Sequence, residues 1–215
     1  MTAQQLEVPA SAPDGSLVAA VLTPAELRVA EALLRCVARW GLSKTTMEDI
    51  AREAGVSRAT VYRLYPGGKS SIMYSAVRSE VQRLLAALTA EVADAGSVED
   101  CLAQAMHQAA VFLASHPALA FMRDHERAAL AQVLSFERMD ALFIVSGVVM
   151  GPVLSRFLDA EDAVAAGTWG ARLVVSYLSE PADDVDLCDR ESVRSVVRTF
   201  MIPGLPSATR TTTTA

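Results

Sequence analysis

The amino-acid sequence predicts an all-α protein in which a small N-terminal helical domain precedes a larger helical body. Hydrophobic residues make up 52% of the 215 residues, whereas aromatic residues make up only 6%. Apolar residues recur at helical spacing, and no stretch alternates with period two for long enough to predict a strand. Capping and turn residues separate the apolar segments. We therefore expect helices packed on helices around a sizeable core.

We expect four parts along the chain: a flexible leader at 1–22, a three-helix domain at 23–68, a helical body at 69–202 and a disordered tail at 203–215. The leader is polar and rich in Pro and Ser, and the tail ends in a run of threonines. The expected helices lie at about 24–40, 47–54, 58–65, 69–95, 98–115, 118–124, 126–135, 138–157, 160–180 and 189–202.

The first expected helix has a signal at each end. Thr23 and Glu26 form a capping box around Pro24, which stands at the first helical position. Gly41 follows the last apolar turn and ends the helix. The stripe expected to be buried consists of Leu27, Ala30, Leu34 and Val37.

Residues 46–65, TMEDIAREAGVSRATVYRLY, meet the separate physical demands of a helix-turn-helix. Thr46 and Asp49 form a second capping box, and Gly55 permits the left-handed conformation that a sharp turn requires. Ser57 can cap the second helix. The packing positions are Ile50, Ala51, Ala54, Val56, Val61 and Leu64. The side chains left facing outward are Arg58, Thr60, Tyr62 and Arg63.

The remaining helices are separated by clear breaks. Pro66-Gly67-Gly68 precedes the long helix expected at 69–95, and later breaks fall at His116-Pro117, Ser135-Phe136, Asp159 and Pro181–Asp186. The most apolar window, 141–154, is shorter than the roughly 20 residues that a membrane helix needs. It predicts a buried core helix, so we expect a soluble, cytoplasmic protein with no membrane partner.

Charge is distributed unevenly along the chain, whose net charge is −6. Residues 24–83 contain 10 Lys/Arg against 6 Asp/Glu, whereas residues 84–215 contain 9 against 17. The acidic total argues against a general polyanion binder. A basic module attached to an acidic body is, however, what a local contact with phosphate requires.

No arrangement in the sequence predicts a catalytic site, a metal site or a cofactor. The cysteines, Cys36, Cys101 and Cys188, form no CxxC pair, and the three histidines are nine residues apart rather than three or four. The acidic cluster at 183–186 has no second cluster facing it and is interpreted as a surface loop. Gly68-Lys69-Ser70 resembles the end of a P-loop, but the first glycine of that motif is absent.

The N-terminal stretch KTTMEDIAREAGVSRATVYRLYPGGKSSIM, followed by about 130 residues of helices, resembles the tetracycline-repressor (TetR) family of transcriptional regulators. The detailed resemblance covers about residues 24–75, and beyond that only the architecture is similar. It implies a homodimer whose paired helix-turn-helix domains bind successive major grooves of a palindromic double-stranded DNA operator. It also implies that the C-terminal helices enclose a small-molecule pocket, most often for an effector that releases a repressor from DNA.

The residues that match the family motif have chemistry suited to its DNA contacts. Arg58 and Thr60 are placed to reach base edges, and Arg63 is a further candidate. The resemblance assigns phosphate contacts to Tyr62 and to Lys69, and either Thr45 or Thr46 can add one. Two departures from the family, Leu64-Tyr65 in place of His-Phe and the Pro66-Gly67-Gly68 loop, leave the base preference open.

Two further sites are expected in the helical body. Met and Phe side chains concentrate in its middle, where adaptable apolar pockets use them; most of them are equally expected as plain core. The pocket candidates, which favour a small hydrophobic effector, are Met106, Phe112, Phe121, Met122, Phe143 and Met150. A dimer interface is expected on the helices near 160–180 and 189–202, where Gly167 and Gly170 permit close approach.

One alternative from another class stays open at this point. The chain could be an all-helical enzyme or small-molecule carrier whose N-terminal corner does not recognise DNA. It would need a catalytic constellation, which the sequence does not supply. Sequence-preferring DNA binding is the property that distinguishes the two hypotheses, and whether an effector releases or promotes that binding is not decided by the sequence.

Overall fold

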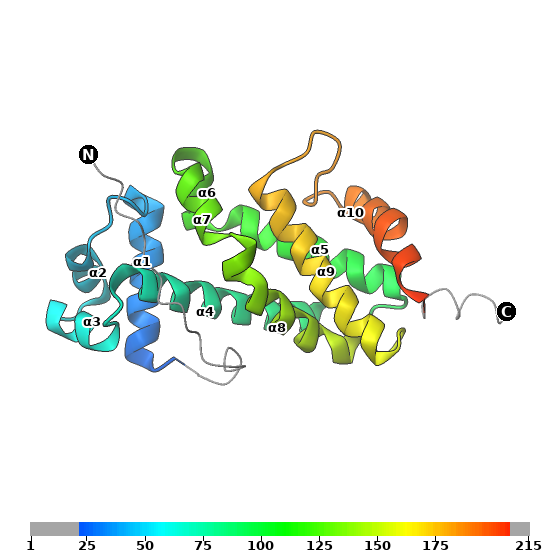
Figure 1. The fold of residues 1–215 in the computed structure, drawn as a ribbon, viewed down its shortest axis with the longest axis horizontal. Helices are drawn as coiled ribbons and strands as arrows, with labels where there is room; N and C mark the ends of the chain where they lie inside the picture. Colours follow the sequence, from blue (N-terminus) through cyan, green and yellow to red (C-terminus); the bar gives the residue numbers. More distant parts are fainter. Residues whose placement is uncertain (1–21, 207–215) are drawn as a thin grey trace. The chain divides into compact units, whose positions relative to one another are not determined.

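The computed structural model describes residues 22–206, without the side chains of 136–138, and its helices are shown in Figure 1. Within this range the chain is helical apart from turns and one isolated bridge between Ala182 and Val185, which confirms the predicted all-α class. The helices are α1 (Pro24–Trp40), α2 (Met47–Ala54), α3 (Arg58–Leu64), α4 (Gly68–Glu91), α5 (Val98–Ser115), α6 (Pro117–His125), α7 (Arg127–Val133), α8 (Phe136–Leu154), α9 (Ala160–Ser179), α10 (Arg190–Val196), the π-helix η1 (Val197–Met201) and the 3-10 helix η2 (Ile202–Gly204).

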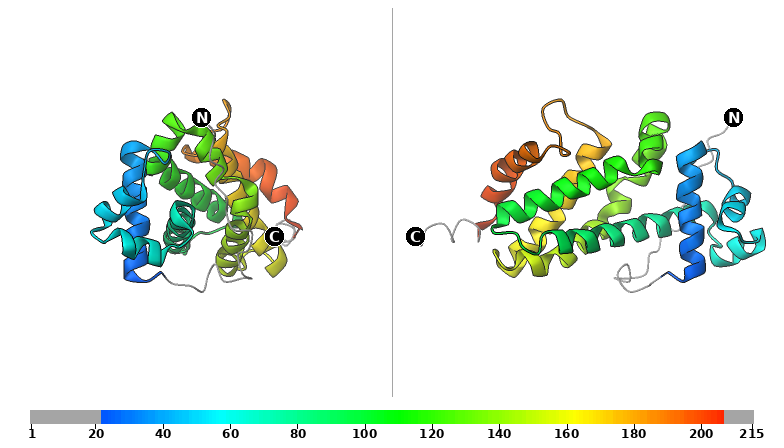
Figure 2. Two further views of the ribbon diagram at one scale, coloured as in Figure 1. Left: turned by 60° about the vertical axis from the view of Figure 1, so that its left-hand side comes forward. Right: turned by 180° about the vertical axis from the view of Figure 1, so that it is seen from behind.

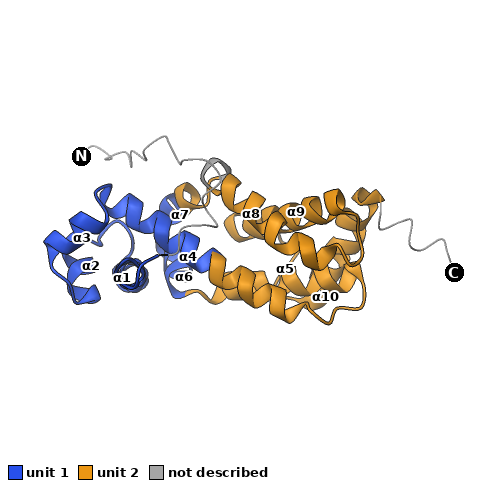
Figure 3. Ribbon diagram, turned by 90° about the horizontal axis from the view of Figure 1, so that it is seen from below, with its two compact units in different colours: residues 1–81, 117–129 blue, residues 82–116, 130–215 orange. Residues whose placement is uncertain are grey.

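The chain divides into two compact units, coloured separately in Figure 3. Unit 1 contains the chain as far as Val81 together with Pro117–Ala129, and unit 2 contains Gln82–His116 and the chain from Leu130. The expected boundary lay at residue 68. The structure instead groups the first half of α4, and α6, with the N-terminal helices.

Several expected helices end at different residues from those predicted. The long helix stops at Glu91 and is followed by a turn, so it is shorter than the expected 69–95. The helix expected at 138–157 begins earlier and ends at Leu154, soon after Pro152. The last helix, expected to run from 189 to 202, changes to π-helix at Val197. Helix ends depend on tertiary contacts, which local patterns do not report.

The expected leader at 1–22 lies outside the described residues except for Leu22. Most of the expected tail at 203–215 also lies outside them. Its first residues do have structure, since η2 continues through Gly204 and Leu205 is only 6% exposed. The start of the expected tail thus holds a helical turn and a buried leucine.

Unit 1 is built around α1, whose buried face differs from the predicted stripe. Ala30 and Val37 are buried as expected, whereas Leu27 and Leu34 are only partly buried. Leu33 and Cys36, which were not predicted, are fully buried. Tyr65, which follows α3, is 3% exposed, and its hydroxyl donates to the carbonyl of Glu26 over 3.1 Å. This aromatic side chain thus anchors the end of α3 to the first turn of α1.

An ion-pair cluster also joins α1 to α2. The carboxylate of Glu53 accepts from Nε of Arg35 at 2.7 Å and from Nη1 of Arg39 at 2.9 Å. The hydrogen bond from Arg35 is the main cause of the lowered pKa of Glu53. Glu53 therefore stays ionised at pH values below the ordinary pKa of a carboxyl group. Its negative charge, paired with Arg35 and Arg39, helps to hold α2 against α1.

In unit 2, α8 and α9 make the most extensive contact between any two helices of the described chain, and they lie side by side in Figures 1 and 2. Glycines make the close approach possible. A Cβ added at Gly147 of α8 would lie 2.6 Å from the carbonyl oxygen of Val164, and one added at Gly167 of α9 would lie 3.1 Å from the Cα of Gly147. The backbones therefore touch where side chains would otherwise separate them.

The C-terminal helices pack on α5 within the same unit. Arg194 of α10 donates to Asp100 at 3.0 Å, and Arg198 of η1 donates to Glu99 at 2.7 Å. Val193 and Val197 are fully buried beside these pairs. Among the described residues, none of the helices combines the length and the apolar character needed to cross a membrane.

Replacing Glu53 by Gln tests the ion-pair cluster. The lowered pKa means that ionised Glu53 stabilises the folded state above the carboxyl pKa of the unfolded chain, which is about 4.3, and that this contribution disappears as the pH falls below it. We expect Glu53→Gln to lower the urea midpoint at pH 7, with the difference from wild type vanishing toward pH 3. Circular dichroism across this range measures it. Glu31→Gln, a carboxylate 3.9 Å from Arg35 on the same helix, is the control and should change the midpoint less.

Replacing Gly147 by Ala tests the contact between α8 and α9. The added methyl group meets the backbone of α9, so we expect a loss of about 1–3 kcal/mol in the free energy of unfolding. Gly96→Ala is the matched control, because a Cβ there has no atom within 4 Å. Equal urea midpoints for the two variants would contradict the close packing.

Candidate nucleic-acid interface

The helix-turn-helix predicted at 46–65 is present as α2, a turn and α3. Thr46 accepts from the N–H of Asp49 at 3.2 Å, and the Asp49 carboxylate accepts from the N–H of Thr46 at 3.1 Å, so the capping box is complete. Gly55 adopts φ +67°, and the N–H of Val56 donates to the carbonyl of Ala51 at 3.0 Å. The local signals in the sequence thus formed the predicted motif.

The inner face of the motif is packed as predicted at its central positions. Ile50 and Val61 are fully buried and Ala51 is 3% exposed. Ala54 and Leu64, at the ends of α2 and α3, and Val56, in the turn between them, are partly exposed. Ser57 caps α3 by accepting from the N–H of Thr60 at 3.1 Å.

Polar and basic side chains occupy the outer face of α3. The side chain of Arg58 is 60% exposed and Tyr62 is 47% exposed, and they share a face because they are four residues apart. Arg63 is exposed as well. Thr60 is partly exposed, with its hydroxyl 2.9 Å from that of Ser57. These side chains offer donors to a ligand without breaking the packing beneath them.

Arg58 has an acidic partner in the free chain. Its Nη1 lies 3.4 Å from Oε2 of Glu48 on α2, and Arg52 lies 3.5 Å from the other oxygen of the same carboxylate. An exposed pair of this kind contributes only about 0–1 kcal/mol. The guanidinium can therefore exchange Glu48 for a better acceptor at little cost.

The structure separates the two threonines proposed for the start of α2. Thr46 is exposed at the helix N-terminus, where its hydroxyl also donates to Oδ2 of Asp49 at 2.6 Å. Thr45 is only 2% exposed, and its hydroxyl donates to the carbonyl of Gly41 at 2.7 Å. The side chain of Thr45 is thus a structural group, and Thr46 is the accessible one of the two. A phosphate contact at this helix start stays a prediction.

Lys69 points into unit 1. Its Nζ donates to the carbonyls of Leu42 at 2.7 Å and Thr45 at 3.0 Å. Burial lowers the pKa of Lys69, and the Glu126 carboxylate partly opposes this effect. The sequence predicted a phosphate contact here. That contact stays a prediction, and the structure adds that the ammonium group already has two backbone partners.

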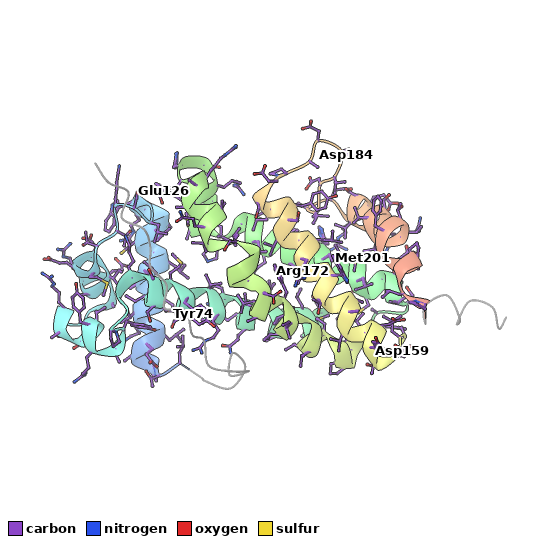
Figure 4. All side chains as sticks on the ribbon, in the orientation of Figure 1. Tyr74, Glu126, Asp159, Arg172, Asp184 and Met201 are labelled. Carbon is purple, nitrogen blue, oxygen red and sulfur yellow. The ribbon has the colours of Figure 1, made fainter. Side chains whose placement is uncertain are left out.

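One residue of this region was missed by the sequence analysis altogether. Glu126, labelled in Figure 4, follows α6 and accepts from the N–H groups of Leu42 and Ser43 at 2.6 Å and 3.1 Å. These partners are more than 80 residues away in the sequence. Glu126 belongs to no recognised motif, so only the fold brings this carboxylate to the helix-turn-helix.

The six pocket candidates fall in different units. Phe121 and Met122 belong to α6 in unit 1, whereas the others belong to α5 and α8 in unit 2. Four of them are buried: Met106, Met122, Phe143 and Met150. The guanidinium of Arg172, labelled in Figure 4, lies 4.7 Å from the ring centroid of Phe143. Ligand contact by these residues stays a prediction, and the core role weighed against it fits their burial.

Comparison with known proteins gives the same family for this region. A family profile described as "Bacterial regulatory proteins, tetR family" matches residues 29–73. An uncharacterized HTH-type transcriptional regulator of Mycobacterium bovis is 43% identical over 58 residues, and the match spans 27% of this chain and 30% of that protein. A homologous regulator of Mycobacterium tuberculosis matches at the same identity and coverage. The chain thus matches less than a third of the length of these relatives.

Solved structures extend the similarity to the whole fold. The TetR family repressor AlkX from Dietzia, implicated in biodegradation of n-alkanes, superposes with a TM-score of 0.62 at 21% identity, covering 85% of this chain and 97% of that one. The regulator FadR from Bacillus subtilis, solved in complex with stearoyl-CoA, gives 0.53 at 16% identity, covering 80% and 97%. At such identities the likeness concerns the fold.

The profile that matches residues 29–73 describes regulatory proteins, which favours the DNA-binding hypothesis over the enzyme alternative. The packed helix-turn-helix, its exposed basic face and the matching profile all agree on one conclusion. Residues 29–73 thus match the tetR family of bacterial regulatory proteins, and the chain shares its fold with a solved repressor of that family.

Proposed function

We propose that this protein is a ligand-responsive repressor that binds a palindromic DNA operator as a homodimer and is released by a small hydrophobic effector. The observation that carries the proposal is the outer face of α3, where Arg58, Tyr62 and Arg63 are exposed on a packed helix-turn-helix. A rigid helix with free donors suits the major groove of DNA. Nothing in the packing of unit 1 requires these side chains to be basic or aromatic.

Each outward side chain has a role that follows from its chemistry. Arg58 can pair bidentately with guanine, and Thr60 and Arg63 lie close enough along α3 to reach neighbouring base edges. Tyr62 suits a phosphate oxygen, because its hydroxyl donates one hydrogen bond and fixes the register. The hydroxyl of Thr46 donates to Asp49 in the free chain and would exchange that acceptor for phosphate. Lys69 can use its remaining N–H for a phosphate beside the start of α4.

The proposed dimer interface lies on α8 and α9. Residues 141–154 are apolar around the whole helix, and a helix of that kind is normally buried on all sides. Within one chain α8 packs on α9 through Gly147, yet Ile144 and Val148 remain 53% and 54% exposed. Trp169 of α9 is 61% exposed. A second copy of the chain would cover these side chains by forming a four-helix bundle.

The interface had been expected on α9 and the last helix. Most apolar side chains of that last helix, including Val193, Val196 and Val197, are buried within unit 2, whereas Phe200 is 71% exposed. We therefore propose α8 in place of the last helix as the partner of α9 in the dimer.

The proposed effector is apolar. Unit 2 contains Met and Phe side chains that can rearrange around an apolar molecule, and its described residues contain no group of His, Cys, Asp or Glu able to hold a metal ion. A structural neighbour was solved with stearoyl-CoA and another is implicated in degradation of n-alkanes. These relatives make long-chain lipids and alkanes the first compounds to test.

Selection of duplexes from a random pool by the full chain tests the DNA-binding proposal. We expect recovery of one palindromic sequence. For the base-reading role, Arg58→Ala should lower affinity for that duplex by about 1–3 kcal/mol and relax the preference at one base pair. Anisotropy titrations on selected and random DNA measure both effects. Arg190→Ala, an exposed arginine of unit 2, is the charge-matched control. Equal losses on selected and random DNA would refute base reading by Arg58.

Sedimentation of single charge substitutions tests the dimer interface. Ile144→Glu and Val148→Glu place a carboxylate on the proposed contact face, so we expect each variant to sediment as a monomer where the wild type is a dimer. Phe200→Glu is the control, since that side chain is the most exposed large apolar group described but belongs to η1. If Ile144→Glu and Val148→Glu remain dimers but Phe200→Glu sediments as a monomer, the interface lies on the C-terminal helices instead.

A further inference from the structure

The connection between α1 and α2, residues 41–46, obtains hydrogen bonds from a residue far away in the sequence. The N–H of Leu42 donates to Oε2 of Glu126 at 2.6 Å, and the N–H of Ser43 donates to Oε1 at 3.1 Å. The hydroxyl of Ser43 donates to the same Oε1. One carboxylate therefore accepts three hydrogen bonds from two consecutive residues.

The carbonyl groups of the same connection are held by a cation. Nζ of Lys69 donates to the carbonyls of Leu42 and Thr45 at 2.7 Å and 3.0 Å. Leu42 is thus fixed through both its N–H and its C=O, by Glu126 and by Lys69 respectively. We call this arrangement of Glu126, Lys69 and residues 41–46 the connection clamp.

Gly41 permits the close approach that the clamp requires. Its φ is +86°, in the region that favours glycine, and a Cβ there would lie 2.7 Å from Oε1 of Glu126 and 2.8 Å from the ring of Phe121. Any side chain at position 41 would push Phe121 of α6 and Glu126, which follows α6, away. Gly41 therefore ends α1 and also makes room for Glu126.

Glu126 is held in its ionised form by this environment. Burial by itself would raise the pKa of Glu126, but the hydrogen bonds from Ser43 and Leu42 and the charge of Lys69 outweigh it and leave the pKa lowered. A charged acceptor forms stronger hydrogen bonds than a neutral one. The clamp is therefore intact at neutral pH.

The clamp determines where α2 begins. Thr45 is held by two hydrogen bonds: its hydroxyl donates to the carbonyl of Gly41, and its own carbonyl accepts from Nζ of Lys69. The next residue, Thr46, is the N-cap of α2. Displacing the connection would displace the N-terminus of α2, which carries the proposed phosphate contact. A shift of about 1 Å at such a group weakens the contacts it makes.

We propose that Glu126 is a positioning residue for DNA binding, which acts by holding the connection clamp and so fixing the start of α2. The inference rests on the proposed function. It also gives that function a control point, because residues 117–129 belong to unit 1 while the chain on both sides of them belongs to unit 2. Glu126 is thus covalently continuous, in both directions, with the part of the chain that is proposed to bind the effector.

The test compares Glu126→Gln with Asp124→Asn in the full chain. Asp124 is two residues away and exposed, and it pairs with the adjacent Arg123, so this variant removes an equal charge without touching the clamp. We expect Glu126→Gln to weaken binding to the selected palindromic duplex by about tenfold, because three hydrogen bonds lose their charged acceptor. Asp124→Asn should stay within about twofold of wild type.

Hydrogen exchange in the free protein reports on the clamp without DNA. In Glu126→Gln the amides of Leu42 and Ser43 should exchange about tenfold faster, whereas the amide of Val61 in α3 should be unchanged. If the exchange rate of the Val61 amide is unchanged, and a stoichiometric DNA titration gives the same active fraction as wild type, the variant is folded. The loss of affinity is then due to repositioning of α2 rather than to general unfolding. Glu126→Asp keeps the charge on a shorter stem and should recover part of the affinity. If Glu126→Gln does not fold, Ser43→Ala removes one of the three bonds and should cause a smaller loss.

The outcomes separate the two proposals. The positioning role is overturned if Glu126→Gln binds the selected duplex as tightly as wild type, or if its Leu42 and Ser43 amides remain protected. Either result leaves the repressor proposal intact. A wild-type chain that selects no sequence overturns both. Faster exchange at Leu42 and Ser43 together with weaker operator binding supports the inference.

Discussion

The structure depends on a constraint of length: α2 and α3 are too short to be stable alone. They contain 8 and 7 residues, and isolated helices shorter than about 12 residues are marginal in water. Each is therefore sustained by its caps and by packing on a longer neighbour. Capping at Thr46 and Ser57, the buried Val61 and Ile50, and the anchor at Tyr65 supply that support.

This dependence has a functional advantage. A recognition helix held by packing loses little conformational entropy when it binds, so its donors can be used for affinity and specificity. The groups that stabilise α2 lie on its inner side and at its start, namely the Glu53 pairs and the connection clamp. The side chains on the outer face of α3 consequently contribute little to the stability of the fold, apart from the weak ion pair between Arg58 and Glu48.

The sequence predicted what is local and missed what is distant. Capping boxes at Thr23 and Thr46 and the turn at Gly55 are encoded within a few residues, and the structure shows each of them. The sequence also predicted helix 141–154 as buried, but the chain by itself exposes Ile144 and Val148, the two side chains that we propose a second copy covers. Glu126 was missed for a related reason: its partners lie on another element, and no spacing rule links residues 42 and 126.

Lys69 shows how one residue can satisfy two demands that the sequence cannot distinguish. The family resemblance assigns it to phosphate, and the structure gives it two carbonyls of the connection between α1 and α2. An ammonium group has three donors, so a third N–H remains for a phosphate while the other two hold the connection. Burial lowers the pKa of Lys69 in the free chain, and a phosphate would favour the charged form. DNA binding would then strengthen the same contacts that position α2, so the clamp and the phosphate site would reinforce each other.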